Sequence, residues 1–496
     1  MVEYGEVNDE IIKDLQNTVG KEFVSTDKED LLIYGADMTE EEPRLPDAIA
    51  MPNTPEEIQK ILLIANKSKI PVVPYITAAN IGGLTIPMRG GIVIDLKRMD
   101  RIIKADENSK YIVVEPNVSF GKLKVYLDKN HPDFMYSYAF SPPHTSVMAN
   151  ALLEGLTEYS YRYGSMGDFI VGLEAVLPTG EITKIGSCAM TKTDHWNMKY
   201  PLPEMSGLFV GWQGMTGIAT KIAVKMLPKP PIIEKNFVLY FNEEDMFNFL
   251  TALTKTDLIQ GDFNFSFQTV MMMGGEKHPV RELNQNDPVA ISGIYTFAYN
   301  KKDKATRVKI LQELANKHST NPKKPIQFMP INLLGKYSNI LELPLSAVYN
   351  ANFMEYRSGI KQDDQQLGAG MSWIGTFAPI SSFRKGYRGG YEIMEKHGFT
   401  PLIFTKMMDS GHFMVIRYLI PFQKPKDNKA VRKLNEEIVD FILDEVGAIP
   451  YKCPSWAAEK VLKRIDPNWI KMAKKIKGAL DPNWILNPGR WSLMPE

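Results

Sequence analysis

The feature that most constrains the fold is an alternation of short β-branched runs with an amphipathic helix, which begins near residue 47. DAIAMP (47–52) and IPVVPY (70–75) flank TPEEIQKILLIANKSK (54–69), whose apolar residues recur at helical spacing. Thr54, followed by Glu57 three residues later, is typical of a helix N-terminus. The pattern predicts a strand, a helix and a second strand, which is how a mixed α and β domain opens.

Further strands and a helix follow in the same region. GGIVIDLKRM (90–99) and KYIVVEPNVS (110–119) predict two buried strands, and SFGKLKVYLDKN (119–130) predicts a helix. A cluster of prolines at 228–231 then ends the pattern. We therefore place a domain boundary after residue 230.

The region after this boundary predicts an antiparallel sheet flanked by helices. The expected strands are NFSFQTVMMM (264–273), VAISGIYTFAYN (289–300) and GHFMVIRYLIPF (411–422), and the expected helices are 301–318 and 428–447. The last stretch repeats DPNWI at 466–470 and at 481–485, which predicts two helix ends with similar turn chemistry. The expected fold class is α+β.

The composition excludes several function classes. Of 496 residues, 58 are Lys or Arg and 58 are Asp or Glu, so neither nucleic acid nor an anionic membrane is the expected partner. Only Cys188 and Cys453 occur, too few for a disulfide framework, a four-cysteine zinc site or a thiolate-held iron-sulfur cluster. The acidic N-terminus and the lack of a long apolar run predict a soluble, cytoplasmic protein with no membrane span. No metal centre is expected either, because the metal-binding histidine pattern described below is incomplete.

Segments rich in small residues give the first indication of a function. VVPYITAANIGGLTIPMRGGIVIDL (72–96) runs from a strand into a loop with paired glycines, where backbone N–H groups can approach phosphate oxygens. Such a loop also suits an ordinary strand connection. Similar small-residue turns recur within 141–186 and 211–230, and the chain closes on KKIKGALDPNWILNPGRW (474–491).

Taken in this order, these four segments resemble the vanillyl-alcohol oxidase superfamily of FAD enzymes, also called the p-cresol methylhydroxylase (PCMH) type. The resemblance implies a PCMH-type FAD-binding domain of two α+β subdomains over residues 1–230, a substrate-binding cap domain over 231–448 and a C-terminal return to the FAD-binding domain over 449–496. It further implies an oxidoreductase with FAD as cofactor and a small molecule as substrate. Homodimers are usual in the family.

The resemblance assigns the cofactor contacts by position. The implied residues are Pro74, Tyr75, Ile76, Thr77, Ala78, Ala79, Asn80 and Gly83 at the pyrophosphate, Ser146, Asn150, Ala151, Tyr163 and Gly164 along the flavin, Gly217 and Ile218 near the adenine or ribitol side, and Arg490 in the closing motif. Where relatives place glycines in the first loop, this chain has Ile76, Ala78 and Ala79. The phosphate cradle is therefore expected to have a different shape.

Some relatives hold FAD covalently through a histidine or a tyrosine. The matching cap segment here is GMSWIGTFAPI (370–380), in which Ile374 lies near the linking position and no histidine or tyrosine occurs. The first loop has no histidine either, and Tyr75 is the alternative linker. Non-covalent FAD is therefore expected.

Two substrate classes remain open within the superfamily. The branch that oxidises 4-alkylphenols and vanillyl-type alcohols carries a Tyr-Arg pair where the chain returns from the cap, and this chain has Tyr451 and Lys452 there. Lysine supplies the positive charge that helps a phenol to ionise, but not the planar fork of arginine. The two residues are equally explained as a packed ring and a solvated ammonium at a domain edge.

The other branch oxidises 2-hydroxy acids such as lactate and glycolate, commonly with a metal pair. Its His-x-Gly-Asp-Gly-Asn-x-His pattern is reduced here to TKMMDSGHFM (405–414), which keeps His412 but has Thr405 in place of the first histidine. Its acidic-His-Gly signature is missing, because Glu459 is followed by Lys460. His412 is expected to start a strand and to share a face with the even-numbered apolar residues that follow, as a cap-lining or a core residue.

Other residues and a third kind of function complete the candidates. His144, in a turn near the expected flavin, is a candidate base for the substrate proton, with a solvated loop histidine as the alternative. His195 and Trp196 are expected beneath the cap, as lining or as packing residues. The chain has no Cys-x-x-Cys-His haem motif, so electrons are expected to leave to oxygen or to a separate carrier protein. The altered first loop also suggests a non-catalytic flavoprotein subunit of an assembly.

Overall fold

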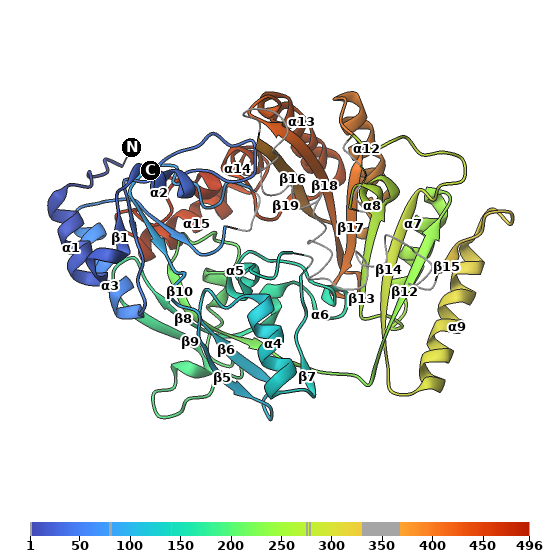
Figure 1. Cartoon of the computed structure of the whole chain (residues 1–496), viewed down its shortest axis with the longest axis horizontal. Coiled ribbons are helices and arrows are strands. Elements are labelled where there is room, and N and C mark those ends of the chain that lie inside the picture. The colour runs from blue at the N-terminus through green and yellow to red at the C-terminus, as the bar shows by residue number, and fades with distance from the viewer. Residues whose placement is uncertain are drawn as a thin grey trace.

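The computed structural model describes residues 2–78, 82–139, 141–273, 276, 279–329 and 368–495. Two smaller sheets and a two-stranded pairing of β7 (Phe134–Met135) with β11 (Leu227–Pro228) occupy the N-terminal half, and one large sheet with its helices forms most of the rest of the molecule (Figure 1). The mixture of helices with mainly antiparallel strands confirms the α+β class. None of the described helices combines the length and the apolar composition that crossing a membrane would require.

The first sheet contains the opening that the sequence predicts. Its order is β1 (Val24–Ser25), β2 (Ala48–Ala50), β4 (Ile92–Asp95) and β3 (Val72–Tyr75). The helix between β2 and β3 is α3 (Pro55–Lys67), and Thr54 caps it by accepting a hydrogen bond from the Glu57 N–H at 3.2 Å. Both strands run parallel to β4, which lies between them. The βαβ opening is therefore right, with β4 inserted at its centre.

The second sheet is antiparallel and carries the segments that reach the site. Its order is β5 (Ile102–Asp106), β6 (Tyr111–Val114), β10 (Ile218–Lys225), β8 (Ile170–Val176) and β9 (Ile182–Gly186). Helix α4 (Phe120–Asn130) buries its apolar face in the same core as β6. The short helix α5 (Val147–Leu152) contributes Val147, Met148 and Ala151 to that core.

The third sheet has eight strands, all antiparallel. Its order is β15 (Gln327–Met329), β12 (Ile232–Tyr240), β14 (Ala290–Ala298), β13 (Gly261–Ser266), β17 (Leu402–Met408), β18 (Phe413–Lys424), β16 (Gly368–Ala378) and β19 (Ile449–Pro450). The chain enters this sheet from β11 (Leu227–Pro228), just after the proline cluster. After Pro450 the chain returns to the first sheet, where Val72 donates to the Ile485 carbonyl at 2.8 Å.

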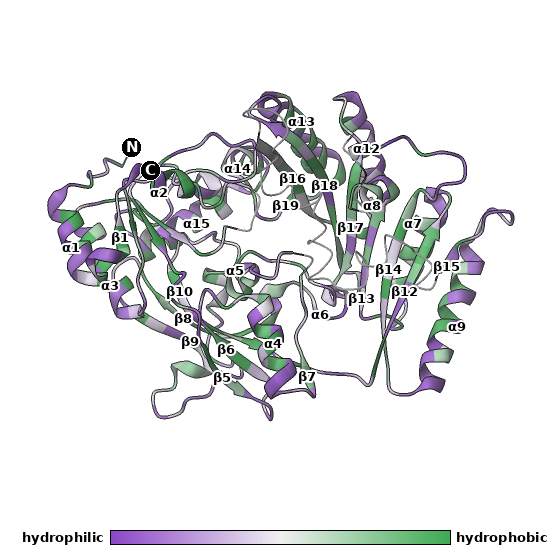
Figure 2. Ribbon diagram, in the orientation of Figure 1, coloured by the Kyte–Doolittle hydropathy of each residue, from purple (hydrophilic) through white to green (hydrophobic). Residues whose placement is uncertain are grey.

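Helices cover one face of this sheet, and its other face looks toward the N-terminal half. The covering helices are α7 (Glu243–Leu253), α9 (Lys301–His318), α12 (Phe383–Lys396) and α13 (Asn428–Phe441). Figure 2 shows hydrophilic and hydrophobic residues alternating along α9 and α13, as expected for helices with one buried face. Alternate strand residues therefore belong to two different cores, one beneath the helices and one shared with the N-terminal half.

One local prediction is wrong, and a second is incomplete. The segment 264–273 is not one strand, because β13 ends at Ser266 and helix α8 (Phe267–Met273) follows with every side chain buried. A segment that is apolar all round shows no period that separates helix from strand. The prediction that both DPNWI copies mark helix ends is incomplete: α14 (Ser455–Leu462) ends shortly before the first copy, but Asp466 of that copy also caps α15 (Pro467–Leu480), and the second copy follows the end of α15.

Candidate functional site

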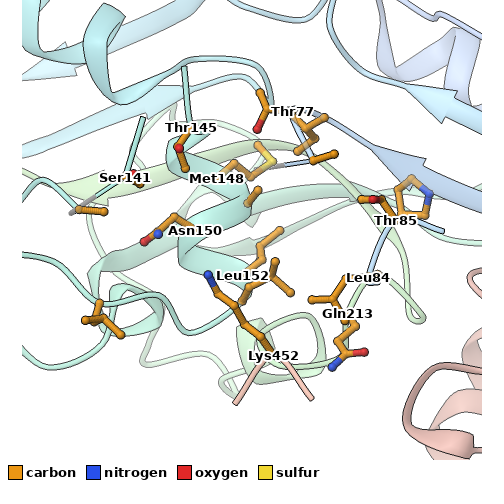
Figure 3. Close-up of a pocket in the computed structure, with 18 of the residues that line it drawn as sticks. Thr77, Leu84, Thr85, Ser141, Thr145, Met148, Asn150, Leu152, Gln213 and Lys452 are labelled. Carbon is orange, nitrogen blue, oxygen red and sulfur yellow. The ribbon is translucent and has the colours of Figure 1, made fainter. Parts of the chain in front are cut away.

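A cavity of about 210 Å³ lies between the N-terminal half and the large sheet. We call its first side the N-terminal wall, whose residues come from 74–78, 84–85, 139, 141–156 and 213–219. We call its second side the cap wall, formed by Phe265, Met273, Trp373, Phe404, Arg417 and Leu419. Figure 3 shows α5 in the middle of the N-terminal wall, with Lys452 of the C-terminal return extending toward it.

The N-terminal wall presents buried oxygen atoms that lack partners. Among the described residues, none forms a hydrogen bond with Ser141 Oγ, Thr145 Oγ1, Asn150 Oδ1 or Gln213 Oε1, and all four residues line the cavity (Figure 3). Buried polar groups are normally paired in folded proteins. The wall is therefore chemically suited to a polar ligand that supplies several hydrogen-bond donors.

The same wall also brings backbone very close to the cavity. Gly214 has a φ of +74°, and a Cβ added there would lie 2.8 Å from Pro74 Cγ. A Cβ at Gly217 would lie 2.8 Å from the Phe209 ring. Glycine is required at both positions for a steric reason, so the small residues of 211–230 are explained by packing at the cavity edge.

Seven of the residues assigned to the cofactor lie in this wall. They are Pro74, Ile76, Thr77, Ala78, Asn150, Gly217 and Ile218. Gly83 adjoins the lining residue Leu84, whereas Ala79 and Asn80 lie outside the described residues. Ser146 and Ala151 belong to α5 without lining the cavity: the Ser146 hydroxyl caps that helix and donates to the Pro116 carbonyl at 2.5 Å.

The other assigned residues lie elsewhere. Tyr75 packs against Tyr34 with ring centroids 4.6 Å apart, outside the cavity lining, and burial raises the pKa of its phenol to about 12. Tyr163 contacts the Phe169 ring, and a Cβ at the neighbouring Gly164 would meet Asp168. Tyr75, Tyr163 and Gly164 therefore pack against neighbouring side chains and do not line the cavity.

Arg490 is fully buried behind the loop rather than in the cavity lining. Its Nη2 donates to the Ile86 carbonyl at 2.7 Å, and its Nη1 donates to Ser455 Oγ at 3.1 Å. Burial lowers the pKa of this guanidinium to about 10. Arg490 thus ties the C-terminal return to the loop that carries Leu84 and Thr85.

The cap wall is mainly aromatic and contains one half-buried guanidinium. Arg417 Nη2 donates to the Tyr451 hydroxyl, and the guanidinium carbon lies 4.7 Å from the Trp373 ring centroid and 5.3 Å from that of Phe404. Its Nε is buried and has no hydrogen-bond partner among the described residues. Tyr451 in turn stacks on Phe377 at 4.7 Å.

Arg417 is the main residue that the sequence prediction missed. Tyr451 was paired with its neighbour Lys452, which does line the cavity, but the cation on its hydroxyl comes from β18, 34 residues earlier in the chain. One signal was present, because Arg417 is the only charged residue in the otherwise apolar run FMVIRYLIPF. A charge inside a buried strand needs a partner or a function.

The three candidate histidines lie away from the cavity. His412 is exposed and precedes β18, which starts at Phe413. The even-numbered apolar residues after it pack beneath the helices, whereas the odd-numbered Arg417 and Leu419 line the cavity. His144 and His195 are exposed, and neither lines the cavity.

Two further candidates prove to be packing residues. Trp196 is buried in a small core and donates to Asp194 Oδ1 at 2.9 Å. Ile374, near the expected linking position, packs beneath the helices, and its neighbour Trp373 lines the cavity instead.

Within the described part of the chain, the cavity lining has a simple chemistry. Its only ionisable side chains are Arg417 and Lys452, and it contains no histidine, tyrosine or cysteine among the residues that the structure places. Across the described ranges, no group of three or more His, Cys, Asp or Glu side chains is arranged to hold a metal ion.

Comparison with known proteins gives two family matches. Residues 46–186 match the FAD binding domain, and residues 355–491 match the C-terminal domain of FAD linked oxidases. The first of these contains much of the N-terminal wall, and the second contains Trp373, Phe404 and Arg417 of the cap wall.

Curated relatives fall into both substrate branches. The chain is 28% identical to glycolate oxidase subunit GlcD of Bacillus subtilis over 49% of its own length and 50% of the relative. It is 30% identical to the 4-cresol dehydrogenase [hydroxylating] flavoprotein subunit of Pseudomonas putida, over 51% and 49%, respectively. It is 24% identical to the mitochondrial D-lactate dehydrogenase [cytochrome] of Arabidopsis thaliana, over 64% and 53%. The chain thus spans about half the length of these relatives.

Solved structures match over the whole chain. 4-Ethylphenol oxidase from Gulosibacter chungangensis superposes with a TM-score of 0.86 at 21% identity, covering 100% of this chain and 99% of that one. p-Cresol methylhydroxylase superposes with a TM-score of 0.84 at 21% identity, covering 99% of each. At this identity the likeness establishes the fold. Family matches, fold and the unpaired oxygens of the N-terminal wall agree: the chain belongs to the PCMH-type FAD-binding superfamily, and FAD is its cofactor.

Proposed function

We propose that this FAD-dependent oxidoreductase oxidises a para-substituted phenol, of the 4-alkylphenol or vanillyl-alcohol type, at the carbon attached to the ring. The observation that carries the proposal is the Arg417–Tyr451 pair, set among the aromatic side chains of the cap wall. A planar aromatic substrate fits between such rings. Its oxygen can reach a guanidinium whose Nε has no partner among the described residues.

The charge at Arg417 explains how such a substrate would lose its proton. A phenol has a solution pKa of about 10, and a half-buried guanidinium at hydrogen-bonding distance favours the phenolate. Lys452 adds a second positive charge to the cavity lining, and Tyr451, outside the lining, accepts a hydrogen bond from the guanidinium. The phenolate then releases electrons toward the para carbon, which weakens its C–H bond.

The acceptor for the hydride from this carbon would be supplied by FAD when it is bound at the N-terminal wall. The residues of this chain that would hold it include Asn150, Thr145 and Gln213, which line the cavity and have buried oxygens without hydrogen-bond partners among the described residues. The oxidised substrate is a quinone methide, which takes up water to give an alcohol or loses a proton to give an alkene. The chain's contribution is orientation, charge and exclusion of water.

The same guanidinium supports a second candidate, the oxidation of a 2-hydroxy acid. Arginine pairs with carboxylates in a planar, two-pronged geometry. This reaction also needs a base for the hydroxyl proton. Within the described lining, the ionisable residues are the cations Arg417 and Lys452, and Thr405 stands where the branch has its first histidine. The phenol needs no such base, because its proton can leave to solvent once the guanidinium stabilises the phenolate, and it is therefore the preferred substrate class.

Anaerobic reduction of the bound flavin distinguishes the candidates. The FAD-loaded protein is mixed with 4-ethylphenol or vanillyl alcohol and, separately, with D-lactate or glycolate, and the loss of visible flavin absorbance is followed. Phenols alone should bleach the flavin, and Arg417→Met should slow bleaching while the exposed His412→Ala should not. Bleaching by hydroxy acids alone would overturn the proposal, and a colourless protein that cannot be loaded with FAD would favour a non-catalytic subunit.

The proposal includes non-covalent attachment of FAD. Trp373, rather than a histidine or tyrosine, faces the cavity from the segment where relatives carry the link. Acid precipitation should therefore release the yellow flavin into the supernatant. Flavin that stays with the precipitated protein would contradict this part.

A further inference from the structure

The segment Asp37 to Glu42, which we call the strap, lies between the N-terminal half and the cap sheet. Its sequence is DMTEEE, and it contacts both the loop 82–86 and the elements β16, β18 and α13. An acidic run of this kind is ordinarily a solvated surface. Here Thr39 and Glu40 are only 2% and 4% exposed, so the strap is part of the interior.

One end of the strap holds the loop that lines the cavity. Asp37 Oδ2 accepts a hydrogen bond from the Gly83 N–H at 2.8 Å. Gly83 has a φ of +67°, and a Cβ added there would lie 2.8 Å from Glu41 Cγ. Beyond it, Arg490 holds the Ile86 carbonyl at 2.7 Å. The two cavity-lining residues Leu84 and Thr85 are thus fixed between two anchored backbone positions.

The other end of the strap holds the cap. The Met38 carbonyl accepts from the Met371 N–H at 3.0 Å, two residues before Trp373 on β16. The Asp37 carbonyl accepts from Lys424 Nζ at 2.8 Å, at the end of β18.

Helix α13 is held by the same segment. Glu40 Oε1 accepts from Asn435 Nδ2 at 2.9 Å, and Glu41 Oε1 lies 3.0 Å from Arg432 Nη2. Asn435 Nδ2 also donates to Ser372 Oγ at 2.9 Å, so this contact reaches the strand that carries Trp373.

The strap is stiff between these two ends. Asp37 Oδ1 accepts from both the N–H of Thr39, at 2.9 Å, and its hydroxyl, at 2.5 Å. Such a closed turn moves as one piece, because the carboxylate that anchors the loop also fixes the chain direction of the strap.

We propose that the strap couples the position of the cap to the binding of FAD, with Asp37 as the positioning residue at the cofactor loop and Arg432 as the anchor on the cap. A ligand that favours one arrangement of a stiff, two-ended element must favour the matching arrangement at the far end. FAD binding at the loop therefore orders β16 and α13, and loosening α13 weakens FAD binding, although α13 does not line the cavity.

The test measures the dissociation constant of FAD, by flavin fluorescence quenching, for four single variants of the full chain. Asp37→Ala should raise it about 10-fold, because a buried N–H loses a charged acceptor. Asp37→Asn keeps an acceptor oxygen and should recover part of that loss. Arg432→Met should raise the constant by about 3-fold.

The matched control is Arg388→Met. Arg388 lies on α12 beside α13 and pairs with Glu243 and Glu244 at 3.0 and 2.8 Å, wholly within the cap. It should leave FAD binding unchanged while costing similar stability in the thermal unfolding of the apoprotein. An equal loss of FAD affinity in Arg388→Met would assign the effect to general loosening of the cap and overturn the coupling.

Amide hydrogen exchange distinguishes coupling from a purely local role of Asp37, because a local anchor would not change the exchange rate at α13. In the wild-type chain, adding FAD should slow amide exchange in α13 as well as in the loop 82–86, and in Asp37→Ala the slowing at α13 should disappear. If Arg432→Met binds FAD as tightly as the wild type, or if α13 is insensitive to FAD in the wild type, the strap is only a local support of the loop and the proposal fails.

Discussion

The two walls of the cavity use opposite chemistry. The N-terminal wall combines aliphatic side chains with glycines and small polar side chains, and among the described residues it presents unpaired oxygens such as Asn150 Oδ1 and Gln213 Oε1. The cap wall is built mainly from large rings around Arg417, whose donor Nε has no hydrogen-bond partner in the described part of the chain. A long wall of aliphatic and small polar residues suits a large ligand, whereas a wall of rings and one charge selects a small aromatic or anionic ligand.

The difference implies a division of labour that can be tested. Substitutions in the N-terminal wall should change FAD binding and leave substrate preference alone. Substitutions in the cap wall should change the kinetics with substrate and leave FAD binding alone.

The largest effect is expected for Arg417→Met. Removing the guanidinium should lower kcat/KM for a 4-alkylphenol by about 100- to 1,000-fold, because a phenolate in a buried site loses its counter-charge. Stopped-flow flavin reduction provides the measurement, and Arg417→Lys should keep part of the rate because it retains the charge without the fork. An unchanged rate of flavin reduction would show that Arg417 does not act on the substrate. A loss of FAD affinity together with the rate would contradict the separate roles of the two walls.

Asn150→Ala is expected to act on the other wall. The variant removes a buried oxygen that faces the cavity, and the dissociation constant of FAD should rise by about 10-fold. With FAD at saturation, KM for the substrate should stay within about 2-fold of wild type. Titration of the apoprotein with FAD measures the first quantity, and a variant that binds FAD normally but has lost substrate affinity would reverse the assignment of the wall.

Trp373→Leu should have a smaller effect, confined to the substrate. The Trp373 ring lies 4.7 Å from the Arg417 guanidinium carbon, and a contact of this kind contributes about 1 kcal/mol. KM for the phenol should rise by about 5-fold as Arg417 becomes less fixed. The control is Trp469→Leu on the exposed face of α15, for which steady-state kinetics should match the wild type.

The smallest effect concerns stability at the seam between the walls. Glu158 is buried beside Lys406 of β17, whose Nζ donates to the Glu158 carbonyl at 3.2 Å, and burial raises the pKa of the Glu158 carboxyl to about 7. The folded chain thus holds this proton at a higher pH than the unfolded chain does. The associated stability is present below the unfolded pKa of about 4.5 and is lost as pH rises through 7.

Glu158→Gln removes this titration. Between pH 5 and 8 the free energy of unfolding should fall by roughly 1 to 3 kcal/mol more in the wild type than in the variant. Urea denaturation at the two pH values measures the difference. Equal decreases in the free energy of unfolding of both proteins would contradict the raised pKa of the Glu158 carboxyl and indicate a more polar surrounding.

The features that could be predicted from the sequence are local. Thr54 and Glu57 locate the start of α3, the prolines at 228–231 precede the first strand of the large sheet, and the runs at 290–298 and 413–424 form strands. Each of these features depends on residues only a few positions apart, so the sequence alone contains all the information needed to predict it. The Met-rich segment shows the limit: a helix that is buried on every side, α8, carries no period to recognise.

The candidate site divides in the same way. The N-terminal wall was largely visible, because a loop that must approach a cofactor closely needs small residues wherever it occurs, and Pro74, Asn150 and Gly217 lie in it. Tyr163 and Gly164 carry the same kind of signal, yet they serve local packing. Small residues thus predict that another group lies close to the backbone, but they do not show whether that group is the cofactor or a neighbouring side chain.

The cap wall was decided by the tertiary structure alone. Alternation along β18 allows either face to point to the cavity, and the choice depends on which face the helices α12 and α13 cover. The helices cover the face of Ile416 and Tyr418, and this places Arg417 against Tyr451, which lies 34 residues further along the chain. By itself the sequence determined most of the strands and helices and the small-residue loops at the cavity edge. Only packing, which acts between residues far apart in the chain, decided which charged side chain of β18 lines the cavity.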